Sequence, residues 1–201
     1  AGHSLGEYSA LACVGAISFE DTLKILQKRG KFMQEAVPSG EGAMLAVLGM
    51  ASKELDKILE TNKKKYECFI ANDNSNLQVV VSGLKKDINL LSDDLNNKKI
   101  KNLKLNVSAP FHCKYMKTAS EKMTGYINDL KMSDLEKPII SNVTAKETSS
   151  SKEIKSLLIS QIEKKVRWLE SVEYMINNEV KNFVEIGPGK VLSGLIKRIN
   201  K

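Results

Sequence analysis

The chain has 201 residues, of which 42% are apolar and 27% are charged. A chain of this length and composition can bury a core in one or two domains, which argues against intrinsic disorder. Its longest uninterrupted apolar run, Ala10 to Ile17, is too short to cross a bilayer, so no membrane partner is expected. The net charge is +7, but lysines carry most of it with little aromatic interleaving, so we do not expect nucleic-acid binding.

The 3 cysteines include no Cys-x-x-Cys pair. This speaks against a disulfide framework and a structural zinc site, and it is typical of a reducing, cytoplasmic setting. The first residues have neither the basic region nor the apolar region of a signal peptide, and the chain does not begin with methionine. We therefore expect further residues to precede Ala1.

A Gly-x-Ser-x-Gly pattern is formed by Gly2, Ser4 and Gly6. It is typical of a nucleophile elbow, in which a strand turns sharply into a helix and holds the serine at the turn, although such a string can also arise in any loop. Residues 5–12 have helical spacing, and the N–H groups and dipole of a helix start can stabilise an oxyanion. We expect both glycines to be required because neighbouring backbone passes close to the turn.

A helix is predicted from about Ser18 to Val37, directly before Pro38. Ser18 and Asp21 have the spacing of a capping box, and the apolar residues that follow recur at helical intervals. Arg29 falls inside this apolar stripe. It is either a snorkelling side chain, whose charge reaches solvent, or a charge that is directed inward.

The central part of the chain alternates short apolar strands with two helices. In the order strand, helix, strand, strand, helix, strand, the predicted elements are 43–48, 52–64, 66–71, 77–82, 85–97 and 100–107. This βαββαβ order is typical of a ferredoxin-like fold, with two helices on one face of an antiparallel sheet. We expect residues 40–108 to form a subdomain that is inserted into a larger domain.

After Pro110 the chain is expected to return to the first domain. The predicted elements are a helix at 114–130, a short strand at 138–141, a loop at 145–151, helices at 152–164 and 168–178, an apolar strand at 183–186 and a terminal helix from about Lys190. Strands that alternate with helices indicate an α/β fold. The Gly187-Pro188-Gly189-Lys190 string lacks the spacing of a phosphate-binding loop and is interpreted as a turn between strand and helix.

A serine nucleophile needs a general base within hydrogen-bond reach. The chain has 2 histidines, and His3 stands on the wrong side of the predicted elbow. His112, two residues after the turn-forming Pro110, is therefore the candidate base, although a histidine at a helix start is often structural. Since no carboxylate stands out as an orienting group, the ring is oriented either by a backbone carbonyl or by a group outside this segment. Cys113 is interpreted as a small core residue.

Motifs in a fixed order along the chain resemble the malonyl-CoA:acyl carrier protein transacylase family. They are Gly2-His3-Ser4-Leu5-Gly6-Glu7-Tyr8, Gln27-Lys28-Arg29-Gly30, Ser108-Ala109-Pro110-Phe111-His112, Gln161 upstream of Trp168, and Glu185-Ile186-Gly187-Pro188-Gly189-Lys190-Val191-Leu192. The resemblance covers essentially the whole chain. It implies an α/β-hydrolase-like core that is incomplete at its N-terminus and is formed by residues 1–39 and 109–201, with the ferredoxin-like subdomain at 40–108.

The resemblance also implies roles for individual residues. Ser4 would be the nucleophile, His112 the general base and later acid, and Arg29 the ligand of the free malonyl carboxylate. The main-chain carbonyl of Gln161 would orient His112, and the backbone N–H of Leu5 would donate a hydrogen bond to the oxyanion. No metal and no bound organic cofactor is implied, because CoA is a substrate.

The implied activity is a ping-pong transfer of a malonyl group from malonyl-CoA to the phosphopantetheine thiol of acyl carrier protein, in fatty-acid synthesis. An excess of lysine suits both an acidic carrier protein and a phosphorylated CoA. The family's N-terminal segment, which completes the oxyanion hole, has no counterpart in this sequence, so we expect the polypeptide alone to be weakly active. Alternatives are a serine esterase or thioesterase, the acyltransferase domain of a polyketide synthase, and a carrier-protein-binding module without catalysis.

Overall fold

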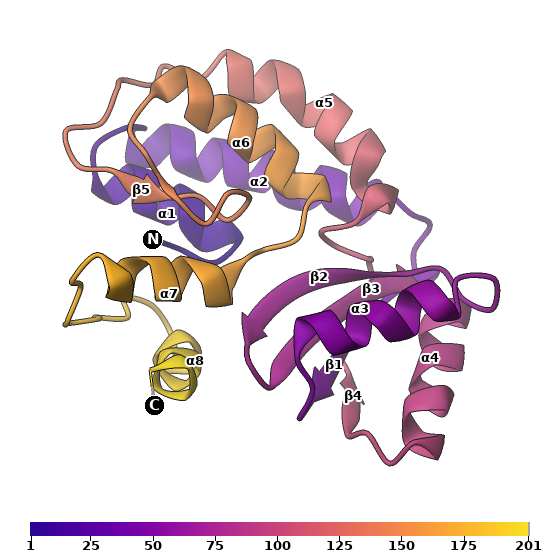
Figure 1. Cartoon of the computed structure of the whole chain (residues 1–201). Helices are drawn as coiled ribbons and strands as arrows, with labels where there is room; N and C mark the ends of the chain where they lie inside the picture. The colour runs from indigo at the N-terminus through magenta and orange to yellow at the C-terminus, as the bar shows by residue number, and fades with distance from the viewer. Residues whose placement is uncertain (201) are drawn as a thin grey trace.

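Two lobes with separate cores make up the computed structural model, which describes residues 1–200 (Figure 1). One lobe is an antiparallel sheet with the helices α3 (Ser52–Thr61) and α4 (Lys85–Asn97). The other lobe is mainly helical and contains α1 (Leu5–Cys13), α2 (Phe19–Glu35), α5 (Lys117–Asn128) and α6 (Ser151–Glu163). The chain runs from the helical lobe into the sheet lobe and back again, which gives a mixed α/β fold.

The sheet has its strands in the order β2-β3-β1-β4, and each neighbouring pair is antiparallel. Its members are β1 (Gly42–Leu48), β2 (Cys68–Ser75), β3 (Gln78–Leu84) and β4 (Asn102–Lys104). Leu45 and Val81 are paired across β1 and β3 and pack in the core that α3 and α4 cover. Because side chains alternate along a strand, Met44 and Val80 lie on the opposite face, where they meet Phe111 from the connection between the lobes.

Two strands of the sheet lobe have bounds that differ from the predicted ones. The strand predicted at 66–71 continues to Ser75, because its polar end pairs with β3 as far as Ser75 and Gln78. The Asp73 N–H also donates to the Val166 carbonyl (2.9 Å) in the other lobe. The strand predicted at 100–107 pairs only over Asn102–Lys104. Beyond it, the Val107 N–H bonds back to the Leu105 carbonyl (2.9 Å), and this tight turn ends the strand.

The helical lobe closes around apolar side chains from its four long helices. Ser18 begins α2 as the capping-box spacing predicts, and its Oγ accepts a hydrogen bond from the Asp21 N–H (3.0 Å). Shorter elements complete the lobe, namely the 3-10 turn η1 (Lys114–Met116) and the antiparallel pair β5 (Ile139–Ile140) and β6 (Glu147–Thr148). The fully or nearly fully buried core residues include Tyr8, Leu11, Ile25, Met33, Met116, Met123, Ile127, Ile154 and Leu158.

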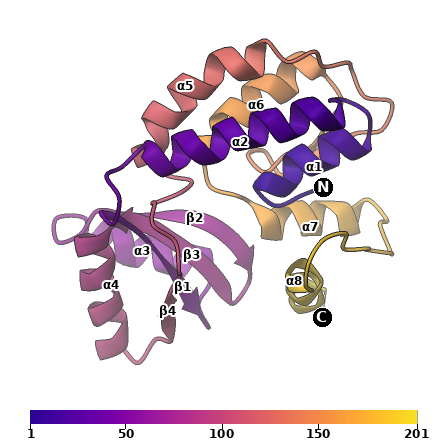
Figure 2. The same ribbon diagram turned by 180° about the vertical axis from the view of Figure 1, so that it is seen from behind.

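Two further helices, α7 (Trp168–Asn177) and α8 (Val191–Ile199), form a small core of their own. In both views α7 lies between α1 and α8 (Figures 1 and 2). The indole of Trp168 and the side chain of Leu195 are buried in this core. Both helices also pack against β2, so they connect the end of the described chain to the sheet lobe.

The strand predicted at 183–186 is wrong, because these residues have no regular structure between α7 and α8. In the part of the chain that the structure describes, no strand lies beside them to share backbone hydrogen bonds, and Val184 and Ile186 are 84% and 90% exposed. Glu185 instead caps α8, where its carboxylate accepts hydrogen bonds from the N–H groups of Leu192 (3.0 Å) and Ser193 (2.8 Å). An apolar sequence was therefore not enough to predict a strand, because a strand also needs a neighbour that pairs with its backbone.

Within residues 1–200, no helix is both long and apolar enough to cross a membrane. Over the same residues, no group of three or more His, Cys, Asp or Glu side chains is placed to hold a metal ion. The three cysteines are free thiols, and Cys113, like Cys68, is buried as a core residue should be.

Candidate active site

Ser4 lies directly before α1 in a backbone conformation that residues other than glycine rarely adopt, with φ at 51°. The turn is tight, since a Cβ atom at Gly2 would lie 2.0 Å from the carbonyl oxygen of Gly6. Position 2 therefore requires glycine. The expectation that both glycines are required is wrong for Gly6, where an added Cβ would meet no described atom within 4 Å.

The serine hydroxyl is in contact with the predicted base. Ser4 Oγ lies 2.8 Å from His112 Nε2, and His112 Nδ1 lies 2.8 Å from the backbone oxygen of Gln161. Because a carbonyl oxygen can only accept, we assign the ring proton to Nδ1, which leaves Nε2 free to accept the serine proton. The structure thus brings together Ser4, His112 and the carbonyl of Gln161, as the resemblance implied.

His112 is neutral at physiological pH. Burial, and secondarily the nearby cation of Arg29, lower the pKa of His112 to about 3. Like Ser4, it has a positive φ, at 59°, so the loop that carries it is held in an uncommon conformation. A buried neutral imidazole that is fixed on both ring nitrogens has the protonation state and orientation that a general base needs.

Arg29 lies in the middle of α2 and is only 6% exposed, so its charge is directed inward and does not snorkel. Its Nη2 donates to Ser4 Oγ (2.9 Å) and to Gln161 Oε1 (3.0 Å), and its guanidinium lies 5.6 Å from the centre of the Tyr8 ring. Among the described residues its Nε has no hydrogen-bond partner. Burial lowers the pKa of Arg29, yet an arginine stays protonated because its ordinary value is so high. A buried cation beside a nucleophile suits an acyl group that carries a negative charge.

Two polar residues of the site were missed by the sequence analysis. Asn142, after β5, accepts a hydrogen bond from the Ser4 N–H (2.7 Å) and donates one to the Gly2 carbonyl (2.7 Å), so it holds the elbow on both sides of the serine. Glu7, in α1, accepts hydrogen bonds from Gln161 Nε2 (2.7 Å) and from the Asn142 N–H (3.2 Å). Neither residue carries a local signal, because Asn142 resembles any polar loop residue and Glu7 any acid in the first turn of a helix.

The two neighbours of Ser4 in the chain have separate surroundings. The Leu5 N–H belongs to the first turn of α1, where N–H groups lack intrahelical acceptors, and this suits the predicted oxyanion donor. His3 Nε2 lies 2.9 Å from Asn74 Oδ1 in β2, and its ring centre lies 5.6 Å from that of Trp168. His3 therefore ties the elbow to the sheet lobe and to α7, in agreement with its exclusion as the base.

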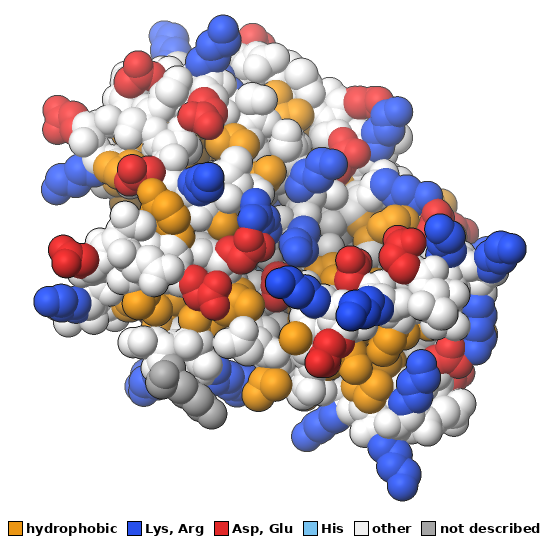
Figure 3. Space-filling view, viewed as in Figure 1, with side chains coloured by type: hydrophobic (Ala, Val, Ile, Leu, Met, Phe, Trp, Pro, Cys, Tyr) orange, Lys and Arg blue, Asp and Glu red, His pale blue; other side chains and the backbone are white. Residues whose placement is uncertain are grey.

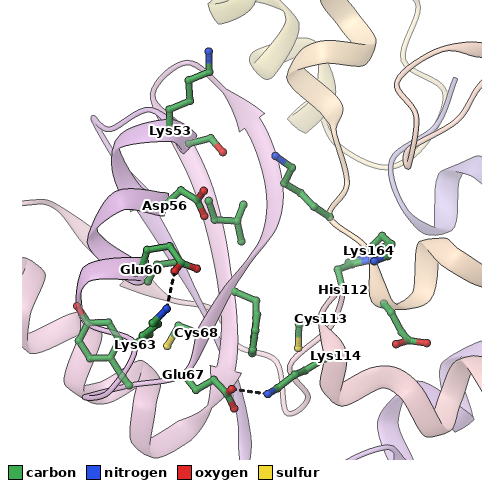
Figure 4. A pocket seen from close by; sticks show the side chains of 17 residues that line it. Lys53, Asp56, Glu60, Lys63, Glu67, Cys68, His112, Cys113, Lys114 and Lys164 are labelled. Atoms are coloured by element: carbon green, nitrogen blue, oxygen red, sulfur yellow. Dashed lines mark hydrogen bonds and ion pairs between the residues drawn. The ribbon is translucent and has the colours of Figure 1, made fainter.

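A groove of about 700 Å³ borders the site on the side of His112 (Figure 4). Its walls are α3 and β2 on one side and the segments around His112 and Lys164 on the other, while Ser4 and Arg29 do not line it. Basic and acidic side chains are interspersed on the molecular face seen in Figure 3, and the groove is mixed in the same way. Its charged residues are Lys53, Lys63, Lys114, Lys164, Lys165, Asp56, Glu60, Glu67 and Glu163.

Taken together, these contacts place the Ser4 hydroxyl at a helix start, against a neutral imidazole that a backbone carbonyl holds and against a buried arginine. Such a set can form and break an acyl ester on Ser4. Comparison with known proteins agrees with this chemistry. The family model described as "Acyl transferase domain" matches residues 1–201.

Curated relatives and solved structures are similar over nearly the whole chain. The malonyl CoA-acyl carrier protein transacylase of Bacillus subtilis is 44% identical over 203 residues, which are 100% of this chain and 64% of that protein. The structure of the transacylase of the same name from Coxiella burnetii has a TM-score of 0.95 at 38% identity. The match covers 98% of this chain and 63% of that one. A malonyl-transacylase in complex with a type II polyketide acyl carrier protein has a TM-score of 0.93 at 38% identity, with 98% of this chain and 64% of that chain covered. The chain thus spans less than two thirds of the length of these proteins.

Proposed function

The chain belongs to the acyl transferase domain family, and we propose that its protein transfers a malonyl group from malonyl-CoA to the phosphopantetheine thiol of acyl carrier protein in fatty-acid synthesis. The observation that carries this proposal is the contact of Ser4 Oγ with His112 Nε2 (2.8 Å) and Arg29 Nη2 (2.9 Å) at one point. The malonyl CoA-acyl carrier protein transacylases that the chain resembles support the choice of donor and acceptor.

In the first half-reaction, Ser4 Oγ attacks the thioester carbonyl of malonyl-CoA while His112 Nε2 takes the serine proton. The Leu5 N–H donates to the oxygen that becomes negative in the tetrahedral intermediate. The intermediate then collapses: the carbon–sulfur bond breaks, His112 returns its proton to the CoA sulfur, and a malonyl ester remains on Ser4. The Gln161 carbonyl keeps the imidazole oriented throughout, because it accepts from Nδ1.

The second half-reaction is the reverse with another thiol. His112 Nε2 takes the proton of the phosphopantetheine thiol of acyl carrier protein, and the sulfur attacks the malonyl ester. Collapse of the second intermediate returns the proton to Ser4 Oγ and releases malonyl-acyl carrier protein. No metal and no bound organic cofactor takes part in this scheme.

Arg29 provides the selectivity in this proposal. Its guanidinium is buried next to Ser4 Oγ, and it can pair with the free carboxylate that a malonyl group has and an acetyl group lacks. A neutral acyl group would leave this buried cation without its negatively charged partner, which is unfavourable. We therefore expect malonyl-CoA to be a much better donor than acetyl-CoA.

The proposal includes the finer architecture. The strand order β2-β3-β1-β4 with α3 and α4 on one face supports a ferredoxin-like subdomain at 40–108. The elbow of Ser4 supports an α/β-hydrolase-like core formed by 1–39 and 109–201. The free thiols support a reducing compartment, which we take to be the cytoplasm.

Intact-protein mass spectrometry after brief incubation with malonyl-CoA tests the proposal. The full-length protein is expected to gain a single malonyl group, to lose this adduct in Ser4→Ala, and to gain far less acetyl group from acetyl-CoA. Subsequent addition of holo acyl carrier protein is expected to remove the adduct and to produce malonyl-acyl carrier protein. If no adduct forms on the full-length protein, the transacylase proposal is wrong.

Two further arms of this experiment separate the alternatives. Arg29→Ala is expected to abolish the preference for malonyl over acetyl groups, whereas an esterase for neutral esters would be little affected. One solved relative is bound to a type II polyketide acyl carrier protein, so such a carrier is the second acceptor to compare. The experiment therefore offers it beside a carrier protein from fatty-acid synthesis. Faster transfer to the polyketide carrier would reassign the pathway but not the reaction.

A further inference from the structure

Glu7 is a buried carboxylate at the site that the proposed mechanism does not use. It is 1% exposed, and its hydrogen-bond partners, Gln161 Nε2 (2.7 Å) and the N–H of Asn142 (3.2 Å), are both uncharged. Burying an acid without a cation in direct contact is unfavourable, and burial raises the pKa of Glu7 to about 7. The cost of burying this charge therefore calls for an explanation in terms of function.

The side-chain amide of Gln161 connects Glu7 to Arg29. Its Nε2 donates to Glu7 (2.7 Å) and to the Ser4 carbonyl (3.1 Å), while its Oε1 accepts from Arg29 Nη2 (3.0 Å). An ionised carboxylate can only accept, so it requires the NH₂ end of the amide to face it and leaves the oxygen end for Arg29. If the amide were turned round, its oxygen would face the carboxylate of Glu7 and its NH₂ group would face the guanidinium of Arg29. Neither contact could then be a hydrogen bond.

The same arrangement leaves N–H groups of Arg29 free to bind a substrate. A carboxylate in direct contact with the guanidinium would occupy its paired donors. Because Gln161 stands between them, Glu7 places a negative charge close to Arg29 while using none of its N–H groups, and Nε is still without a partner among the described residues. Arg29 is thus held against Ser4 and can still bind the carboxylate of an acyl group.

We propose that Glu7 is a positioning residue for substrate selection: through Gln161 it fixes the guanidinium of Arg29 beside Ser4, so that an acyl group with a free carboxylate is preferred to a neutral one. This inference rests on the proposed function and adds to it the residue that makes Arg29 selective. Glu7 acts through the amide, since its carboxylate bonds neither to the Ser4 hydroxyl nor to Arg29 in the described structure.

The test compares two substitutions of Glu7 in the full-length protein at pH 8, where the carboxylate is ionised. Glu7→Leu keeps a side chain of similar size but removes the hydrogen-bond acceptor, and Glu7→Gln keeps an acceptor oxygen for Gln161. The quantity measured is the ratio of kcat/KM for malonyl-CoA to that for acetyl-CoA in the acylation of Ser4. A residue that only fills space would change both rates together and leave this ratio unmoved.

We expect Glu7→Leu to lower the malonyl-to-acetyl ratio by about tenfold or more, the size of effect that follows when a charge-assisted hydrogen bond loses its alignment. Glu7→Gln is expected to keep the ratio within about threefold of the wild type, because the acceptor is retained. Glu20→Gln, which removes one exposed carboxylate from the helix that carries Arg29, serves as the control and should leave the ratio unchanged.

Gln161→Met provides a second route if Glu7→Leu does not fold. It removes the amide but keeps the backbone carbonyl that bonds to His112, and it should lower the same ratio by about the same factor as Glu7→Leu. When Glu7→Leu does fold, the double variant should show no further loss, because both substitutions break one chain of contacts.

The outcomes separate this inference from the proposed function. If the wild type forms no malonyl adduct on Ser4, both are overturned. If the wild type is acylated and selective, but Glu7→Leu or Gln161→Met keeps its ratio, only the inference is overturned. An equal loss in Glu7→Leu and Glu7→Gln would also overturn it, because the amide variant retains the acceptor on which the route through Gln161 depends.

Discussion

Around Ser4, two buried ionisable side chains have pKa values that move in opposite directions. Burial lowers the pKa of His112 from 6.5 to about 3 and raises that of Glu7 from 4.5 to about 7. Between about pH 5 and 6, both groups are therefore neutral in the folded protein and charged in the unfolded chain. Unfolding then takes up one proton at His112 and releases one at Glu7, so the two contributions to the pH dependence of stability cancel.

Substitution of Glu7 by glutamine removes the contribution of Glu7 to the pH dependence of stability and leaves that of His112. A raised carboxyl pKa favours folding below about pH 4.5, and that contribution is lost as the pH rises through the folded pKa near 7. The hydrogen bonds from Gln161 and Asn142 and the charge of Arg29 oppose the shift only in part. We expect the unfolding free energy of Glu7→Gln, relative to wild type, to rise by up to about 1.4 kcal/mol per pH unit over this range.

Urea unfolding at a series of pH values measures this difference. Glu20→Gln provides the baseline, because it makes the same chemical change at a carboxylate that is exposed on α2. A constant difference for Glu7→Gln as well would mean that the folded pKa of Glu7 is close to its ordinary value.

The residues with distinctive chemistry could be predicted from the sequence. Ser4, His112 and Arg29 are the kinds of side chain that acyl transfer to and from an anionic group requires, and the structure brings all three together. Asn142 and Glu7 could not be predicted, because each acts through partners far away in the chain. The Ser4 N–H and its acceptor Asn142 are 138 residues apart, and nothing near either residue announces the contact.

At the scale of single elements, the start of α1 depends on the two glycines to very different degrees. Gly2 cannot accept a Cβ, which would lie 2.0 Å from the Gly6 oxygen, whereas a Cβ on Gly6 would have no atom of residues 1–200 within 4 Å. We expect Gly2→Ala to lower the unfolding free energy by about 2 kcal/mol or more and to abolish acylation of Ser4. Gly6→Ala is expected to preserve folding and to stabilise α1 by about 0.5–1 kcal/mol, because alanine favours the helix more than glycine does.

This pair is checked by chemical unfolding and by the yield of malonyl-Ser4. Since both substitutions add the same methyl group within one turn of each other, each is the control for the other. Similar losses in the two variants would mean that the elbow is not defined by the contact between Gly2 and Gly6.

Most helices and strands could be predicted, because their apolar residues recur with the period of the element. The helix predicted at 168–178 is observed as Trp168–Asn177, and the order of elements from 43 to 104 is as expected. The predictions fail where a backbone pairing partner, and not the local sequence, decides whether a segment is a strand. The polar end of β2 is a strand because β3, and from the other lobe Val166, offer it backbone groups. The apolar segment at 183–186 is irregular because no strand among the described residues does the same there.

At the scale of the whole molecule, the sheet lobe holds the loop that carries His112. Ser82, in the middle of β3, donates a hydrogen bond to the Phe111 carbonyl, directly before His112. Gly42 at the start of β1 is packed against Pro110, whose Cδ would lie 2.2 Å from an added Cβ. The sequence indicated that the lobes alternate along the chain, but it gave no sign that the sheet fixes the position of His112.

The exposed contacts between the lobes are expected to matter less than the buried ones. Glu67 pairs with Lys114 and accepts from Tyr115, but the Glu67 and Lys114 side chains are 49% and 54% exposed. An ion pair in water contributes little to stability. The position of His112 should therefore depend more on the Ser82 hydroxyl, which is inaccessible to solvent, than on this ion pair.

Ser82→Ala tests whether the sheet lobe supports catalysis. The substitution leaves the Phe111 carbonyl without its donor, which should lower the unfolding free energy by about 1–2 kcal/mol and, by loosening the loop of His112, slow the acylation of Ser4 by about tenfold. Ser92→Ala is the matched control, since Ser92 is also buried in this lobe and donates to Asn102 Oδ1 (2.7 Å), away from the site. It should cost similar stability and leave the acylation rate unchanged. Equal rates in the two variants, measured by quenched flow below their unfolding temperatures, would show that the loop keeps His112 in place without the sheet.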